Sequence, residues 1–231
     1  MKKILNYFSK FELILLISSY TLIITSFIIF DRSNYLSLVS SLFGVTSLSF
    51  IAKGNPIGQI IGIIFSILYG IISFSYAYYG EMITYLFMTG PMEVIALVSW
   101  LKHPSKNSKS EVKIGSIKPK EIFLIAILAI VVTTVFYFIL KYFDTTNLLI
   151  STFSITTSFI AVYLTFRRSP YYALAYAVND IVLIVLWILA TIENITYVSV
   201  IICFLVFLVN DIYGFINWCK IRKKQNEKPN S

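Results

Sequence analysis

Residues that support enzymatic chemistry are scarce in this chain of 231 residues. It has a single histidine, His103, and two cysteines, Cys203 and Cys219. These three residues give no zinc-binding spacing and no basis for a Ser/His/Asp triad, and two cysteines do not indicate a disulfide framework. The sequence also lacks a glycine-rich P-loop, which argues against an ATP-driven cycle within this chain. We therefore expect a protein that is not an enzyme and that needs neither metal nor cofactor.

Charged residues are few as well, at 13% of the chain against 58% hydrophobic residues, and the mean hydropathy is +0.81. The charges cluster between long uncharged runs, which is typical of helical membrane proteins with several spans. Apolar stretches of roughly 17 to 25 residues predict eight transmembrane helices. They are expected at residues 11–30, 35–52, 57–79, 82–101, 121–141, 146–166, 171–191 and 195–217.

The 19 lysines and arginines predict the orientation of the chain. With the N-terminus in the cytoplasm, all of them except Arg32 and Lys141 fall on the cytoplasmic side. Because cytoplasmic loops are enriched in basic residues, we expect both termini in the cytoplasm and the protein in the cell membrane. The net charge of +8 then reflects topology, and nucleic acid is not an expected partner. Residues 102–120 are predicted to form a flexible lysine-rich loop, which follows this rule or attracts anionic lipid.

One half of the chain repeats the other. The segment EMITY at residues 81–85 returns as ENITY at residues 193–197. Two further pairs keep the same order: Lys53-x-x-Pro56 matches Arg167-x-x-Pro170, and Glu93 before Trp100 matches Asp211 before Trp218. Three ordered matches on equivalent segments indicate an internal duplication.

The repeat predicts an all-α membrane protein of eight transmembrane helices in five parts. These are an extra N-terminal helix (1–34), a three-helix repeat (35–101), a basic loop with a linker helix (102–145), a second three-helix repeat (146–218) and a basic cytoplasmic tail (219–231). A repeat of three helices would invert, and the single linker helix restores the orientation. The two copies are therefore expected to be parallel, in a 3+1+3 arrangement as in sugar transporters of the SWEET type.

Three acidic residues, Glu93, Asp180 and Asp211, lie near the middle of predicted spans. A carboxylate in the hydrocarbon region costs several kcal/mol unless it is paired, protonated or faces a watery cavity. Each is therefore expected to point into the bundle, either toward a ligand or into a hydrogen bond between helices. Glu93 follows Pro91, which would kink the helix, so we assign this pair to gating or packing.

Polar and aromatic neighbours of the two aspartates extend the predicted binding site. Asn179 and Asn210 precede them, and amide and carboxylate pairs on two helices suit a hydroxyl-rich ligand. Helical spacing places Tyr176 and Trp187 on the face of Asp180, and Tyr213 and Asn217 on the face of Asn210. Aromatic rings there would stack on a flat heterocycle.

Gln59, near the inner entrance, is a further candidate within a stripe that equally fits close helix packing. Trp100 and Trp218, at cytoplasmic span ends, are predicted to be interfacial anchors, and Trp187 admits the same interpretation.

Long segments of the chain resemble the PnuC (Pnu) family of transporters for nicotinamide riboside and related vitamins. They are KGNPIGQ, YYGEMITYLFMT, YLTFRRSP, YAVNDIVLIVLW and VNDIYGFINW, spread over nearly the whole chain. The resemblance implies a SWEET-like 3+1+3 fold, a homotrimer with one pathway in each protomer, and passive uptake of a nucleoside-like substrate. It also implies that a cytoplasmic kinase traps the substrate by phosphorylation.

One departure from the family bears on the substrate. Nicotinamide riboside members have a Trp-x-x-Trp element before the acidic residue of the seventh span, where this chain has Ala173 and Tyr176. Nicotinamide riboside is the leading expectation, with thiamine, riboflavin or a deoxyribonucleoside as alternatives. An alternative from a different functional class is a structural or sensory membrane subunit that does not transport. Proton coupling stays open, because three carboxylates near the midplane could titrate.

Overall fold

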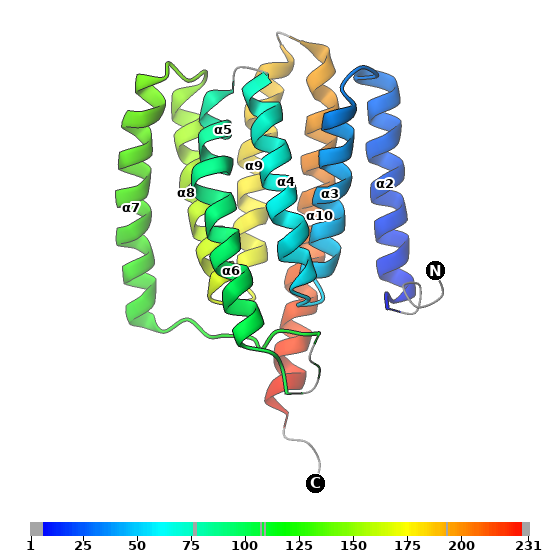
Figure 1. The fold of residues 1–231 in the computed structure, drawn as a ribbon, viewed down its shortest axis with the longest axis vertical. Coiled ribbons are helices and arrows are strands. Elements are labelled where there is room, and N and C mark those ends of the chain that lie inside the picture. Colours follow the sequence, from blue (N-terminus) through cyan, green and yellow to red (C-terminus); the bar gives the residue numbers. More distant parts are fainter. Residues whose placement is uncertain (1–6, 76–77, 107, 109, 193, 228–231) are drawn as a thin grey trace.

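The computed structural model describes residues 7–75, 78–106, 108, 110–192 and 194–227. In these residues the chain forms a bundle of upright helices (Figure 1). The elements are α2 (Lys10–Phe30), α3 (Tyr35–Ile51), α4 (Ile57–Ser75), α5 (Tyr79–Thr84), the π-helix η1 (Tyr85–Thr89), α6 (Gly90–Lys102), α7 (Pro119–Tyr142), α8 (Leu148–Phe166), α9 (Tyr172–Thr191), the 3-10 turn η2 (Ile195–Tyr197) and α10 (Val198–Asn226). Glu193, which opens the second copy of the repeated pentapeptide, lies outside the described residues.

The apolar helices confirm the expected class of an all-helical membrane protein. Within the described ranges, seven helical segments are long and apolar enough to cross a bilayer, and α3 is a shorter apolar helix of 17 residues. Helices α5, η1 and α6 together make one of these segments, Tyr79–Lys102. Helix α10 continues to Asn226, beyond the predicted end of its span at residue 217, because its basic last turns remain helical outside the apolar stretch.

Local sequence signals account for several helix ends. Ser9 and Glu12 form a capping box at the start of α2, and the Asn34 side chain accepts a hydrogen bond from the Ser37 amide at the start of α3. The ends of α3 and α8 share a left-handed turn, at Gly54 with φ 67° and at Arg168 with φ 55°. Helices that follow each other along the chain therefore reverse direction within short connections.

The two outer helices lie at opposite edges of the bundle, α2 at one and α7 at the other (Figure 1). Helix α2 packs mainly against α3 and α10, and α7 packs mainly against α8. The start of α2, the end of α10 and the connection from α6 to α7 lie at the same end of the bundle (Figure 1). We call it the basic end, since Lys53, Lys220 and Lys224 lie there together with the lysines of that connection.

Two tryptophans are buried at the basic end instead of facing the lipid interface. Trp100 and Trp218 are 1% and 0% exposed, and their rings pack 5.3 Å apart. The Trp100 Nε1 donates a hydrogen bond to the Thr165 carbonyl at 2.9 Å, and the Trp218 Nε1 donates to the Ile51 carbonyl at 2.8 Å. The prediction of interfacial anchors is therefore wrong for this pair. Each indole N–H donates to a carbonyl at the end of a helix, and that carbonyl also accepts a backbone hydrogen bond from the following turn.

The predicted flexible loop between α6 and α7 is packed in its described part. The Val112 amide donates to the Gly54 carbonyl at 2.8 Å, the Gly115 amide donates to the Arg168 carbonyl at 2.9 Å, and the Val112 side chain is completely buried. A Cβ atom at Gly115 would lie 2.2 Å from the Arg167 carbonyl oxygen, so only glycine fits this approach. The loop is ordered because its backbone donors pair with helix ends from both halves of the chain.

Candidate functional site

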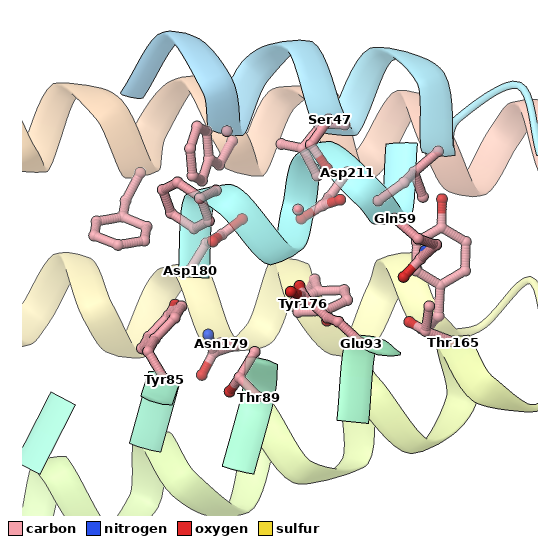
Figure 2. Close-up of a pocket in the computed structure, with 18 residues that line it drawn as sticks. Ser47, Gln59, Tyr85, Thr89, Glu93, Thr165, Tyr176, Asn179, Asp180 and Asp211 are labelled. Atoms are coloured by element: carbon pink, nitrogen blue, oxygen red, sulfur yellow. The ribbon is translucent and has the colours of Figure 1, made fainter. Parts of the chain in front are cut away.

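A cavity lies at the centre of the bundle, between residues of α3, α4, η1, α6, α8, α9 and α10 (Figure 2). Its polar lining residues are Ser47, Gln59, Tyr85, Thr89, Glu93, Thr165, Tyr172, Tyr176, Asn179, Asp180 and Asp211. The apolar part of the wall includes Phe65, Phe204 and Phe207. The cavity volume is about 50 Å³, whereas ligand sites commonly measure roughly 300–1,000 Å³. In this conformation the cavity has room for only a few water molecules.

Glu93 reaches the cavity from the first turn of α6, just after the π-helix. Its Oε2 accepts a hydrogen bond from the Ser66 hydroxyl of α4 at 2.7 Å. A Cβ atom at Gly62, one turn away on α4, would lie 3.3 Å from Glu93 Oε1. The glycine therefore makes room for the carboxyl group next to α4, and the π-helix sets its position along the span.

Asp180 of α9 and Asp211 of α10 approach each other in the same cavity (Figure 2). Both side chains are 3% exposed. Beside them, the Asn179 Oδ1 accepts hydrogen bonds from the hydroxyls of Thr157 at 2.7 Å and Ser158 at 2.9 Å. These two bonds from α8 hold the carbonyl side of the amide outward, so its NH₂ group is turned to the cavity as a donor.

Three of the seven buried side-chain atoms without a hydrogen-bond partner among the described residues lie along this wall. In the described residues, Gln59 Nε2, Thr89 Oγ1 and Asp180 Oδ2 are buried without a hydrogen-bond partner, and all three residues line the cavity. A buried polar atom without a partner costs about 1–3 kcal/mol. Two donors and an acceptor left open around one cavity indicate a site for a polar ligand or ordered water.

The ionisable side chains of the lining, apart from its tyrosines, are all acidic. Glu93, Asp180 and Asp211 contribute three acidic groups, and no lysine, arginine or histidine occurs among the described residues of the lining. Three tyrosines, Tyr85, Tyr172 and Tyr176, add aromatic surface. The arrangement can therefore bind a cation that carries hydroxyl groups and a flat ring, and it disfavours an anion.

Aromatic side chains close the cavity at both ends. At the basic end, Tyr172 packs 4.7 Å from Trp218, beside the Trp100 and Trp218 pair. At the opposite end, the Trp187 Nε1 donates to the Tyr69 hydroxyl at 2.9 Å, and the Tyr69 and Tyr85 rings lie 4.4 Å apart. The cavity is thus occluded from both sides of the bundle.

Six of the residues singled out in the sequence line this cavity: Gln59, Glu93, Tyr176, Asn179, Asp180 and Asp211. Five others do not, namely Pro91, Trp187, Asn210, Tyr213 and Asn217. Trp187 is fully buried in the aromatic closure. Asn210 donates to Ser19 Oγ on α2 at 3.1 Å, Tyr213 donates to Glu12 Oε1 at 2.8 Å, and Asn217 donates to the Ala52 carbonyl at 2.8 Å. These three side chains connect helices outside the cavity.

Sequence reasoning missed five polar lining residues, Ser47, Tyr85, Thr89, Tyr172 and Thr165. Tyr85 closes the repeated pentapeptide, and Thr89 precedes the Gly90-Pro91 interruption. Both were therefore marked by a local signal that pointed to the right segment. Tyr172 and Thr165 carry no such signal, since nothing in the sequence distinguishes them from packing residues. In the described part of the chain, no cluster of three metal-ligating side chains occurs.

Comparisons with known proteins match most of the chain to membrane transporters. Residues 34–220 match the family model described as "Nicotinamide mononucleotide transporter". The "Nicotinamide riboside transporter PnuC" of Neisseria mucosa is 26% identical over 203 residues, which cover 86% of this chain and 77% of that protein. A crystal structure described as that of "the Vitamin B3 transporter PnuC" superimposes with a TM-score of 0.83 at 24% identity, over 95% of this chain and 94% of the other. This last likeness establishes the fold.

Proposed function

Since this chain belongs to the PnuC family of nicotinamide mononucleotide transporters, we propose that it carries a cationic nucleoside, nicotinamide riboside, across the cell membrane. The observation that carries the proposal is the acidic lining of the central cavity. Glu93, Asp180 and Asp211 face a cavity that has no basic lining residue within the described chain. Nicotinamide riboside combines a pyridinium cation, a flat ring and ribose hydroxyls, and each part has a matching group in the wall.

The same acidic lining argues against a phosphorylated cargo such as the mononucleotide in the family's description. A phosphate monoester carries about −1.5 to −2 charges at neutral pH. In a buried site it would need arginine, lysine or several backbone donors, and here it would face three acidic groups. The name of the Neisseria mucosa relative, a nicotinamide riboside transporter, refers to the cargo without phosphate.

Thiamine is the second candidate, because it is also a cation with an aromatic ring. Riboflavin and the deoxyribonucleosides are neutral and would leave the acidic groups uncompensated. The incomplete Trp-x-x-Trp element does not decide between the two cations. Ala173 is fully buried in a hydrophobic cluster beside Trp218, while Tyr176 lines the cavity. Three tyrosines can therefore supply the ring contacts that the tryptophans supply in other members.

We infer a 3+1+3 duplication from contacts that match between the halves. Trp100 and Ser99 of α6 donate to the Thr165 and Phe166 carbonyls of α8, and Trp218 and Asn217 of α10 donate to the Ile51 and Ala52 carbonyls of α3. The third helix of each predicted repeat thus closes on the first helix of the other. The parts proposed on this basis are 1–34, 35–101, 102–145, 146–218 and 219–231, with the last one helical as far as Asn226.

The ion pairs of the outer helices follow the same pattern. Lys53, after α3, pairs with Glu12 in the first turn of α2, and Arg167, after α8, pairs with Glu121 in the first turn of α7. Lys53 and Arg167 are equivalent positions of the repeat. Each outer helix is therefore tied to the first helix of one half, which favours two equivalent halves moving relative to each other.

Transport would then proceed by alternating closure of the two aromatic ends. The basic end is proposed to face the cytoplasm of the cell, as the distribution of lysine and arginine predicts. The cargo would enter from the opposite end when the Trp187–Tyr69 contact opens, and would leave when the Trp100–Trp218 contact opens. We propose that net uptake follows the gradient and that cytoplasmic phosphorylation retains the cargo, since a phosphorylated product does not suit the acidic cavity. The homotrimer implied by the family resemblance stays a prediction.

Binding to purified protein tests the proposed cargo. The panel contains nicotinamide riboside, its reduced form, which is neutral but similar in size, nicotinamide mononucleotide and thiamine. We expect nicotinamide riboside to bind at least tenfold more tightly than the neutral and phosphorylated analogues, which corresponds to about 1.4 kcal/mol or more.

Two variants test whether the acidic cavity causes the preference for nicotinamide riboside. Asp180→Asn should abolish the preference for the cation over its reduced form, whereas Asp144→Asn, which removes an exposed carboxylate outside the cavity, should keep it. Equal binding of the charged and reduced forms to the wild type would overturn the charge argument. Preferred binding of thiamine would keep the mechanism and change the cargo.

A further inference from the structure

A second cavity lies on the outside of the bundle, between α2 and α10. Its volume is about 380 Å³, and its lining combines small hydroxyl residues of α2, such as Ser18 and Ser26, with apolar residues of both helices. Leu22, Leu205 and Val209 on its walls are roughly half exposed, at 55%, 46% and 53%. We call this cavity the α2–α10 groove. Its position on two membrane-crossing helices places it against the acyl chains of the bilayer.

Three of the four hydroxyl groups that line the groove have partners within the chain. Ser18 donates to the Leu15 carbonyl at 3.0 Å, Ser26 donates to the Ile23 carbonyl at 2.8 Å, and Ser19 accepts from Asn210 Nδ2 at 3.1 Å. Such local bonds satisfy hydroxyls on helices without an external ligand. The groove therefore offers an occupant apolar contact and the space left by small side chains, which suits a single acyl chain.

The groove continues into a polar cavity at the basic end. This polar cavity has a volume of about 570 Å³ and lies between the same two helices. Its lining includes Phe11 and Glu12 of α2 and Tyr213, Lys220 and Lys224 of α10. On α10, the lining residues of the two cavities follow each other at intervals of three or four residues from Ile202 to Lys224. They therefore form one continuous helix face, apolar in the membrane and basic at its end.

Two lysines of the polar cavity form no ion pair among the described residues, because the acidic residues of the cavity are engaged by other partners. Glu12 is bound by Lys53 at 3.0 Å and by the Tyr213 hydroxyl at 2.8 Å, and Glu111 accepts a hydrogen bond from Gln225 at 2.7 Å. The exposed ammonium groups of Lys220 and Lys224 form no ion pair among the described residues. An anionic group at this place would find two positive charges one turn apart and acidic neighbours that are already engaged.

From this continuity of shape and change of polarity, we propose that the α2–α10 face binds one anionic phospholipid. One acyl chain lies in the groove, and the phosphate contacts Lys220 and Lys224 at the basic end. The lipid belongs to the leaflet at the basic end of the bundle. It completes the packing of α2, which otherwise contacts mainly α3 and α10. The proposal is independent of the cargo, because neither cavity shares a lining residue with the central one.

Native mass spectrometry of the full-length protein in detergent tests the proposal. The probes are phosphatidylglycerol and phosphatidylcholine with identical acyl chains, and inorganic phosphate. We expect one tightly bound phosphatidylglycerol and weaker binding of phosphatidylcholine. Lys220→Gln/Lys224→Gln should weaken phosphatidylglycerol binding about fivefold for each lysine removed. Arg222→Gln/Lys223→Gln removes the same charge from the same helix outside the cavity and should keep wild-type binding.

The groove is tested by a second pair of variants. Ser18→Phe fills the groove and should displace the lipid, whereas Thr21→Phe adds the same ring to α2 outside the groove and should not. Both positions are exposed, so neither change disturbs the core. Equal retention of the two phospholipids by the wild type would overturn the proposal. So would thermal stabilisation by inorganic phosphate that matches the effect of phosphatidylglycerol, or an oligomer that Ser18→Phe dissociates, since a second copy would then occupy the groove.

Discussion

At the scale of residues, the cavity depends on side chains that are held from behind. Asn179 has its Oδ1 fixed by Thr157 and Ser158, and Glu93 is fixed by Ser66. The groups that remain free, Gln59 Nε2 and Asp180 Oδ2, are buried and open to the cavity. A ligand therefore meets donors and acceptors whose positions are set before it arrives, which lowers the entropic cost of binding.

The two hydroxyls behind Asn179 give the first prediction. Thr157→Val and Ser158→Ala each remove a donor to Asn179 Oδ1, so the amide can rotate and its NH₂ group is less often directed into the cavity. We expect the Kd for the cargo to rise about two- to tenfold in each variant, the equivalent of one hydrogen bond. Binding to purified protein measures this change. Thr152→Val, which removes a hydroxyl that bonds only within α8, is the control. Unchanged Kd values in both variants would contradict the positioning role.

At the scale of elements, the sequence predicts the helices well and their faces poorly. The apolar runs locate the seven segments of the described residues that are long enough to cross a bilayer and the shorter helix α3, because length and hydropathy are local properties. The cavity residues depend on rotation about the helix axis, which neighbouring helices decide. Asn210 and Asp211 are adjacent, yet Asp211 faces the cavity while Asn210 reaches Ser19 on α2. A rotation of about 100° per residue separates the two roles.

Contacts between helices explain the other differences. Trp100 and Trp218 occur where interfacial anchors are common, but their N–H groups pair with carbonyls of helices that are distant in the sequence. The described part of the loop of residues 102–120 is bound by Gly54 and Arg168, which no local pattern connects to it. Predicting either would have required the arrangement of the two halves.

The matched tryptophans give the second prediction. Trp100→Phe and Trp218→Phe keep an aromatic ring but remove the donor, so each variant loses one buried hydrogen bond at the basic end. We expect each to lower the free energy of unfolding by about 0.5–1.5 kcal/mol, and by similar amounts because the proposed duplication makes the two contacts equivalent. Thermal unfolding in one detergent compares them. A large loss in only one variant would show that the two closures are not equivalent, and Trp187→Phe reports on the bond at the opposite end.

The interruption between η1 and α6 gives the third prediction. The Gly90 amide donates to the Tyr85 carbonyl in a π-turn, and Pro91, which has no N–H, follows directly. Pro91→Ala supplies the missing donor and allows a regular α-helix, which would shift Tyr85 and Thr89 against the cavity. We expect a several-fold lower uptake rate in vesicles with the protein still folded. Pro119→Ala at the start of α7 is the matched control. Wild-type uptake by Pro91→Ala would contradict a gating role for this interruption.

At the scale of the whole molecule, two closed ends surround a cavity that is too small for a nucleoside. Aromatic contacts close each end, and the matched hydrogen bonds at the basic end connect the two halves. Binding therefore requires the halves to move apart at one end, and release requires the same at the other. The duplication that we propose would put equivalent halves on either side of one site, which is the arrangement expected for rocking transporters.

The source of energy for this cycle gives the last prediction. The sequence contains no P-loop motif, and we predict that the cargo only equilibrates. In proteoliposomes we expect the internal concentration of nicotinamide riboside to reach the external one and to stop there, with or without a pH gradient. Enclosing a kinase and ATP should make uptake continue, because the phosphorylated product leaves the equilibrium and does not fit the acidic cavity. Accumulation above the external concentration in an imposed pH gradient would instead mean that Glu93, Asp180 or Asp211 carries protons together with the cargo. An Asp180→Asn variant that equilibrates but no longer accumulates would then identify the coupling group.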